Sequence, residues 1–150
     1  MTLSQKEKTL LKDMKSTEQL CVDKYARGAK QAKDKQLKDL FSQLSQCEQQ
    51  HYDLLAGIEK GTVSQPESGN AQQPTFTAAY GKEDSPDKKN DSYLCSDVLA
   101  AEKHTSHLYD TCVFEFKNPQ IRDAINAIQK QEQNHGKMIY DYMTANHMYS

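Results

Sequence analysis

Apolar residues recur every three or four positions in four stretches of the chain, which is the pattern of amphipathic helices. The first stretch runs from Leu10 to Ala29 and the second from Leu37 to Ile58. The third runs from Leu94 to Cys112 and the fourth from Ile121 to Tyr142. This period predicts four long helices and an all-α fold.

Short polar motifs mark where these helices begin and end. Ser4 and Glu7 form a capping-box pattern at the start of the first helix. The polar pair Lys33-Asp34 separates the first two helices. Asp91-Ser92 offers an N-cap for the third helix, and Asn118-Pro119 places a cap and a first-turn proline before the fourth.

Residues 61–90 contain three of the four prolines and many Ser, Gln, Asp and Lys residues, which is typical of a loop. Within this loop, Phe76 and Tyr80 are apolar enough to anchor part of it onto the helices. A chain of 150 residues fits one domain. We therefore expect a single domain spanning 1–150, with a helical hairpin at about 4–60, a crossover loop at about 61–90 and a second hairpin at about 91–147.

The two hairpins repeat each other without a gap when the first is shifted by 84 positions. The shift aligns the acidic, imidazole and phenol side chains Glu18 with Glu102, Tyr25 with Tyr109, Glu48 with Glu132, and His51 with His135. The sequence therefore predicts a duplicated hairpin with an internal pseudo-two-fold axis.

Glu18 and Glu48 each lie 15 residues from Lys33, and the corresponding glutamates lie equally far from Lys117. Equal distance from the turn of an antiparallel pair means equal height along it. A helix of about 26 residues is roughly 39 Å long, and 30 extended residues reach roughly twice as far. The crossover can therefore run the length of the molecule, which predicts an up-down-down-up four-helix bundle with the crossover between helices 2 and 3.

This arrangement brings four carboxylates and two imidazoles to one level inside the bundle. The alternative is that the glutamates are solvated charges on helix surfaces, but Leu11, Met14 and Cys21 place Glu18 on the apolar face. Converging carboxylates repel each other in an apolar interior, and two divalent cations would neutralise them. We therefore predict a two-metal site with the ligands Glu18, Glu48, His51, Glu102, Glu132 and His135.

The six ligands are expected to bind the metals in two ways. Glu48 and Glu132 are expected to bridge the two metals, whereas Glu18 and Glu102 each bind one, as do the two histidines. Carboxylate and imidazole ligands suit Fe or Mn, and Zn is a further candidate.

One Glu from each of two helices, with Glu-x-x-His from each of the other two, resembles the ligand set of ferritin-like di-iron and di-manganese carboxylate proteins. The segments STEQLCVDKYARGAKQAKDKQLKDLFSQLSQCEQQHYDLL and LAAEKHTSHLYDTCVFEFKNPQIRDAINAIQKQEQNHGKMIYDYM resemble the ferritin-like spore coat proteins of the coat F family, from endospore-forming bacteria. The resemblance implies a ferritin-like bundle, favours iron, and implies chemistry with O2 or peroxide.

Tyr25 and Tyr109 lie two helical turns after their glutamates on the same face. Two interpretations stay open for them: packing in the core, or donation of a hydrogen bond to a metal-ligand carboxylate. His104 and His107 fall off the ligand face and are expected to be exposed.

The four cysteines stand singly, without a C-x-x-C pair, which argues against a thiolate metal site or a redox pair of that type. We expect them to be reduced and mostly buried. Cys21 is the thiol expected nearest the metals, whereas Cys47 is expected to point away from the site because it precedes Glu48 by one residue.

A net charge of −2 and a pI of about 6.2 give no basic footprint for nucleic acid. No apolar run is long enough for a membrane helix, and the first 15 residues lack the apolar core of a signal peptide. We therefore expect a cytoplasmic protein, assembled into the spore coat if the resemblance holds.

Two functions fit the sequence. One is a redox-active di-metal protein with oxidase- or peroxidase-type activity; the other is a structural spore coat protein in which a metal only stabilises the bundle. Candidate partners are O2 or peroxide, other coat proteins, and a second copy of the chain in a homodimer. Storage of iron in a hollow shell is weaker, since the sequence shows no fifth helix.

Overall fold

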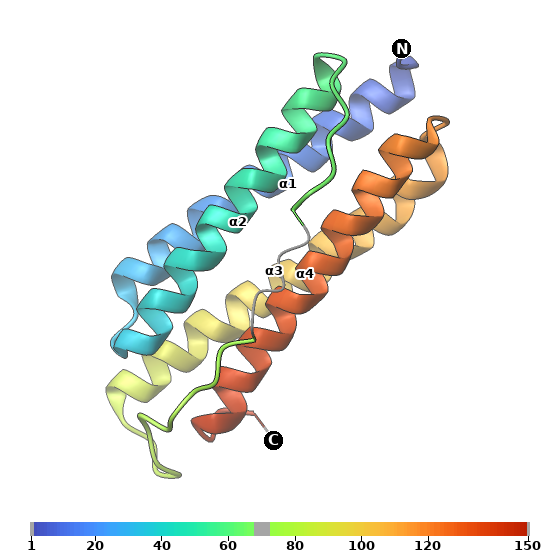
Figure 1. Ribbon diagram of the computed structural model, residues 1–150. Coiled ribbons are helices and arrows are strands. Elements are labelled where there is room, and N and C mark those ends of the chain that lie inside the picture. The colour runs from blue at the N-terminus through green and yellow to red at the C-terminus, as the bar shows by residue number, and fades with distance from the viewer. Residues whose placement is uncertain (1, 68–72, 150) are drawn as a thin grey trace.

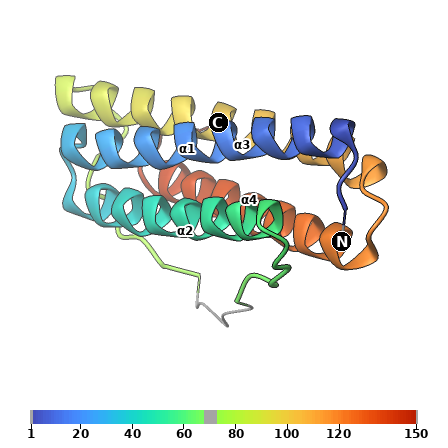
Figure 2. The ribbon, with the colours of Figure 1, turned by 90° about the horizontal axis from the view of Figure 1, so that it is seen from above.

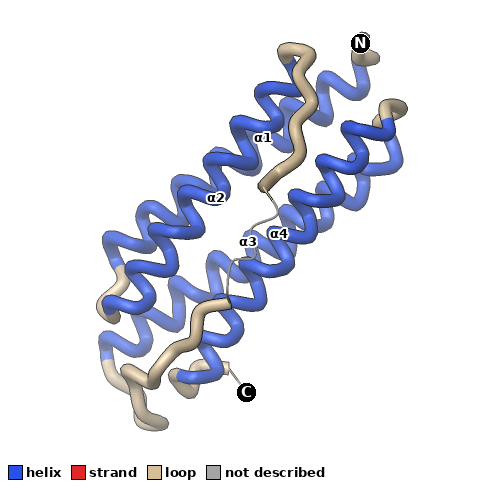
Figure 3. The backbone as a smooth tube through the Cα atoms, in the orientation of Figure 1, coloured by secondary structure: helices blue, strands red, loops and turns tan. Residues whose placement is uncertain are grey.

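The computed structural model describes residues 2–67 and 73–149, and over these residues it contains four helices and no strand (Figures 1 and 3). The helices are α1 (Gln5–Gln31), α2 (Lys35–Glu59), α3 (Pro86–Glu115) and α4 (Pro119–Ala145). They pack side by side as a bundle. The predicted all-α four-helix bundle is therefore confirmed.

Capping side chains fix the ends of the helices. At α1 the Glu7 amide donates to Ser4 Oγ at 3.1 Å, and the Ser4 amide donates to Glu7 Oε2 at 2.7 Å, which completes the capping box. At α4 the Gln120 amide donates to Asn118 Oδ1 at 2.8 Å, as expected of an N-cap followed by proline.

The third helix begins earlier than expected. Its N-cap is Ser85, whose Oγ accepts from the Lys88 amide, and Pro86 is the first helical residue. Asp91, expected at the N-cap, is instead buried within α3. Its carboxylate accepts hydrogen bonds from the amides of Lys33 and Asp34, at 2.8 and 2.9 Å, in the turn between α1 and α2. Asp91 therefore binds the turn of the other hairpin.

The described parts of the crossover run along the bundle, and α3 begins at the same end of the molecule as α2 (Figures 1 and 2). Two carboxylates tie the hairpins together at the two ends. Asp91 at the start of α3 binds the α1–α2 turn, and Glu7 at the start of α1 accepts from the Lys117 amide in the α3–α4 turn at 3.0 Å. Each helix is thus antiparallel to the two that it packs against, and the up-down-down-up topology is as predicted.

The second part of the crossover is attached to the helices as expected from Phe76 and Tyr80. The Phe76 ring packs edge-on against Tyr142 of α4, with ring centres 5.4 Å apart. The amides of Ala79 and Tyr80 donate to Asn146 Oδ1, and the Tyr80 hydroxyl donates to Asp91 at 2.6 Å. Residues 68–72 of the expected crossover lie outside the described residues.

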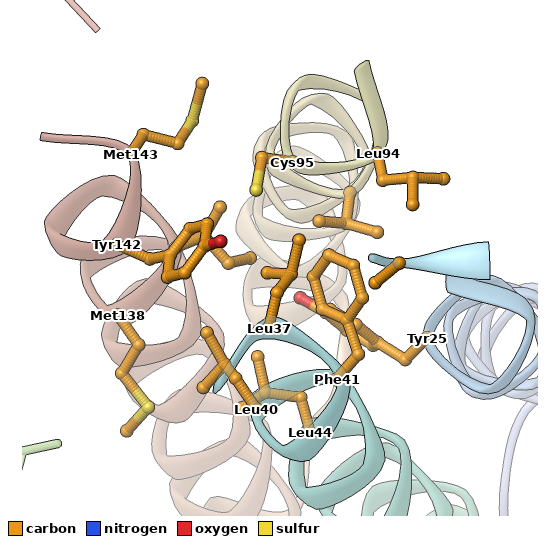
Figure 4. Close-up of a cluster of buried hydrophobic side chains, with 13 residues drawn as sticks. Tyr25, Leu37, Leu40, Phe41, Leu44, Leu94, Cys95, Met138, Tyr142 and Met143 are labelled. Carbon is orange, nitrogen blue, oxygen red and sulfur yellow. The ribbon is translucent and has the colours of Figure 1, made fainter. Parts of the chain in front are cut away.

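Two apolar clusters fill the interior, one toward each end of the bundle. Figure 4 shows the first, where Tyr25, Leu37, Phe41 and Tyr142 pack together with side chains from all four helices. The second gathers the buried residues Leu11, Met14, Leu55, Ile58, Tyr109, Cys112, Phe116, Ile121, Ile125 and Ile128. Between the two clusters lies a layer of buried polar side chains.

Candidate metal centre

The polar layer contains every ligand predicted from the sequence. Glu18 comes from α1, Glu102 from α3, and the Glu-x-x-His pairs from α2 and α4. The structure brings all six side chains, Glu18, Glu48, His51, Glu102, Glu132 and His135, together in the interior, where all are buried. Helical spacing places each Glu one turn before its His, so both project into the bundle from the same face.

The six side chains form two overlapping groups. In each group, one ligand atom from every member lies within 4.8 Å of the others. The first group is Glu18, Glu48, His51 and Glu132, and the second is Glu48, Glu102, Glu132 and His135. Glu48 and Glu132 belong to both groups, which is the position of bridging ligands. Each group could therefore hold a metal ion.

Hydrogen bonds within the layer run between the two hairpins. His51 Nδ1 lies 2.8 Å from Glu132 Oε1, and His135 Nδ1 lies 2.7 Å from Glu48 Oε1. The two contacts are equivalent in the repeat, because His135 corresponds to His51 and Glu48 corresponds to Glu132. Both Nδ1 atoms thus face the carboxylates, so Nδ1 is the nitrogen that each ring presents to the centre.

The two tyrosines contact the glutamate of the opposite hairpin. The Tyr25 hydroxyl donates to Glu102 Oε1 at 2.5 Å, and the Tyr109 hydroxyl donates to Glu18 Oε1. Both tyrosines are also fully buried beside the apolar clusters. Packing and hydrogen bonding therefore coexist, and each hydroxyl fixes one oxygen of a glutamate while leaving the other free.

The four free oxygens are the most informative feature of the layer. Among the described residues, the buried side-chain atoms without a hydrogen-bond partner are the Oε2 atoms of Glu18, Glu48, Glu102 and Glu132. A buried carboxylate oxygen without a partner is costly, by roughly 1–3 kcal/mol or more for a charged group. Cations are the partners that such oxygens fit, so the donor set suits metal ions.

The protonation equilibria of the layer show the same excess of negative charge. Burial and the neighbouring Glu48 raise the pKa of Glu18 to about 8. Burial also raises the pKa of Glu132 well above its usual range, with added repulsion from Glu18 and Glu48. Without metal, the interior thus favours protons on these carboxylates.

The pKa shifts of Glu48 and His51 favour their charged forms instead. Burial opposes ionisation of Glu48, but its neighbours Glu18, His135 and His51 outweigh burial and hold its pKa well below the usual range. Burial likewise opposes protonation of His51, and its contacts with Glu132, Glu18 and Glu48 outweigh it and raise the pKa of the imidazole. In the absence of metal, protons on Glu18, Glu132 and His51 therefore offset the negative charge that divalent cations would otherwise neutralise.

Two residues that the sequence reasoning missed contact the histidine rings. Gln131 Oε1 lies 2.6 Å from His51 Nε2, the ring nitrogen turned away from the carboxylates. Cys47 lies beside His135 and helps to raise its pKa, although burial opposes this. Cys47, expected to point away from the site, thus lies near a ligand side chain of α4, although neither ligand group includes it. Cys47 and Gln131 occupy equivalent repeat positions, each just before its glutamate, and that was the available signal.

The remaining expectations about polar side chains are met. His104 and His107 are exposed. Cys21 is buried with its Sγ 3.5 Å from Thr105 Oγ1, and its pKa is raised by burial and by Glu48, which places it near the carboxylates. The four cysteines are free, with Cys21, Cys95 and Cys112 buried and Cys47 half-buried.

The glutamate of α3 and the buried Glu-x-x-His of α4 fall within the segment that a comparison with protein families recognises. Residues 90–150 match the family model of the Coat F domain. The second hairpin is therefore similar to the Coat F domain. The resemblance expected from the sequence is therefore confirmed over these residues, and it indicates a relationship to spore coat proteins.

The Coat F domain supplies Glu102, Glu132 and His135, and the first hairpin supplies the equivalent three residues at the same repeat positions. No curated protein and no solved structure gave a significant match to the chain. Among the described residues, no helix combines the length and hydropathy that crossing a bilayer requires.

Proposed function

We propose that this protein binds two iron ions between its four helices and uses them to reduce O2 or peroxide, as a ferritin-like component associated with the spore coat. The observation that carries the proposal is the set of four buried Oε2 atoms without a hydrogen-bond partner, two of which belong to the shared glutamates Glu48 and Glu132. The Coat F match supports the association with the coat.

Each side chain has a definite task in this proposal. Glu48 and Glu132 would be shared by the two metals, because both ligand groups include them. Glu18 with His51 completes one site, and Glu102 with His135 completes the other. Their oxygen and nitrogen donors suit Fe and Mn, and the resemblance to ferritin-like proteins favours iron.

The surrounding residues orient the ligands. Tyr109 and Tyr25 hold one oxygen of Glu18 and Glu102, so the other oxygen faces the centre. Gln131 accepts from His51 Nε2, which fixes the ring with Nδ1 unprotonated toward the metal. When bound, an iron pair supplies two electrons, enough to reduce hydrogen peroxide to two water molecules with uptake of two protons.

Anaerobic titration with Fe(II), followed by exposure to O2 or peroxide, tests the proposal. The expected result is that each chain binds two irons and that the oxidant oxidises both. Absorption spectroscopy measures this oxidation. The double variant Glu48→Gln with Glu132→Gln should lose both, whereas Glu83→Gln in the exposed crossover should behave as wild type. Equal metal binding by the double variant and the wild type would refute the proposal.

A second candidate function is a structural one, in which the bundle serves as a building element of the coat. The observation that favours it is the pair of end contacts, Asp91 to the first turn and Glu7 to the second, which join the hairpins without metal. Fractionation of spores tests it together with the metal content of the coat layer. A chain found in the coat without metal would favour the structural function, and a chain found only in vegetative cytosol would exclude it.

A further inference from the structure

The 84-residue repeat lets each position around the proposed metal pair be compared with its equivalent in the other hairpin. The six ligands and both tyrosines match type for type. Two pairs of positions near the ligands do not match. Gly136 of α4 is equivalent to Tyr52 of α2, and Leu99 of α3 is equivalent to Lys15 of α1. The two hairpins therefore share their ligands but differ at these neighbouring positions.

A groove of about 410 Å³ lies on the face between α3 and α4. Leu99, Lys103 and His107 line it from α3 and Gly136 from α4, and it extends inward to the glutamates Glu102 and Glu132. Gly136 has no side chain to fill this groove. Beyond its own helix, a Cβ at this position would have one described neighbour within 4 Å, Leu99 Cδ1 at 3.6 Å.

The equivalent face between α1 and α2 carries large side chains instead. Lys15 Nζ lies 5.6 Å from the centre of the Tyr52 ring, so these side chains cover the surface together. Glu59 Oε2 accepts from the same Nζ at 2.5 Å, which holds the lysine in place. Tyr52 and Lys15 occupy the repeat positions that Gly136 and Leu99 occupy in the second hairpin.

The exposed fractions of the ligands follow the same asymmetry. Glu102 is 3% exposed and His135 is 4% exposed, whereas their equivalents Glu18 and His51 are 0% and 1% exposed. The residual exposure is thus larger at Glu102 and His135 than at their equivalents in the first hairpin. The differences are small, and they agree in direction with the groove.

We propose that the groove at Gly136 is the route by which small polar ligands reach the metal pair, and that Tyr52 with Lys15 closes the equivalent route in the first hairpin. The inference rests on the proposed metal centre. The rim carries both Lys103 and Asp110, so it suits neutral molecules of a few heavy atoms, such as hydrogen peroxide, better than a strongly charged ligand. Ligands arrive first at the site of Glu102 and His135.

Binding of nitric oxide to the Fe(II)-loaded protein tests this route, since its rate is read from absorption changes without turnover. Gly136→Tyr gives the second hairpin the residue of the first and should slow nitric oxide association by about tenfold or more, while two irons per chain are retained. Gly136→Leu fills the same space with a more flexible side chain and should act in the same direction. Gly136→Ala is the matched control and should leave the rate near that of wild type.

The opposite face provides the complementary change. Tyr52→Gly should open the α1–α2 face, so the double variant Gly136→Tyr with Tyr52→Gly should recover most of the lost rate. Wild-type association rates in both Gly136→Tyr and Gly136→Leu, with iron bound, would overturn the inference. A wild-type chain that binds no iron pair would instead refute the proposed function, so the two failures are distinguishable.

Discussion

Cys21 on α1 and Thr105 on α3 face each other inside the bundle, with Sγ 3.5 Å from Oγ1. Their positions differ by 84, so they are equivalent residues of the two hairpins, and the pseudo-two-fold axis passes between them. The bonds from histidine to glutamate and from tyrosine to glutamate occur in matched pairs about this axis. Each substitution in one half therefore has a counterpart in the other against which it can be measured.

The tyrosine hydroxyls should matter for metal affinity. Tyr25→Phe and Tyr109→Phe each remove a bond to a terminal glutamate without changing the shape of the core. We expect each to weaken metal binding by about 10- to 100-fold, the usual effect of removing a partner that orients a ligand. Titration calorimetry with Fe(II) or Co(II) measures this.

Tyr142→Phe is the matched control for the two tyrosine variants. Its hydroxyl donates to Asp34 Oδ2 at 2.8 Å, away from the glutamates, so its loss should lower stability without changing metal affinity. Equal metal affinities in all three variants would show that Tyr25 and Tyr109 serve packing alone.

The metal-free protein should become less stable as the pH rises. In the folded chain the pKa of Glu18 is raised from 4.5 to about 8, so its protonated form stabilises the fold at low pH and that contribution is lost between these values. The raised pKa values of Glu132, His51 and His135 act in the same direction. The lowered pKa of Glu48 acts oppositely, below its ordinary value of 4.5. Thermal unfolding between pH 5 and pH 8, without metal, measures the decline.

Glu18→Gln separates this effect from other sources of pH dependence. The neutral amide keeps an oxygen for the Tyr109 hydroxyl and removes the buried charge. We expect the metal-free variant to melt higher than wild type at pH 8, with a flatter pH profile and weaker metal binding. In a chain of this size each kcal/mol gained raises Tm by roughly 2–4 °C. A lower Tm for the metal-free variant than for wild type at pH 8 would contradict a destabilising buried charge at Glu18.

Two glycine-to-alanine substitutions should have opposite effects on stability. A Cβ at Gly28 would lie 2.8 Å from a ring carbon of Phe41, inside the buried core, so Gly28→Ala should destabilise the fold by about 1–3 kcal/mol. Gly136→Ala meets ordinary contact distances on a helix and should stabilise by up to about 1 kcal/mol. Urea denaturation compares the two, and a stabilising Gly28→Ala would show that Phe41 can move aside.

The Asp91 carboxylate, which joins the hairpins at one end, should contribute more to the free energy of unfolding than an exposed acidic side chain nearby. Asp91 is fully buried and accepts from two amides of the α1–α2 turn and from the Tyr80 hydroxyl. Asp91→Ala leaves these donors without their partner and should cost about 2–4 kcal/mol. Asp87→Ala, on an exposed turn of the same helix, should change the free energy of unfolding by less than about 0.5 kcal/mol.

The sequence alone determined the features that depend on helical spacing. The 3.6-residue period fixed four helices, and Glu-x-x-His spacing placed Glu48 with His51, and Glu132 with His135, on single faces. Equal distances from the turns at Lys33 and Lys117 placed the glutamates at one height. These inferences succeed because a helix has a rigid and local geometry, so residue numbers translate directly into positions along one element.

Only the tertiary structure decided which side chains meet between elements. It paired Tyr25 with Glu102, moved Asp91 from an expected N-cap to the opposite turn, and brought Cys47 beside His135. It also showed that the absence of a side chain at Gly136 leaves a groove reaching the glutamates. Such contacts depend on the rotation and separation of neighbouring helices, which are set by the packing of the whole core and not by the spacing within any one helix.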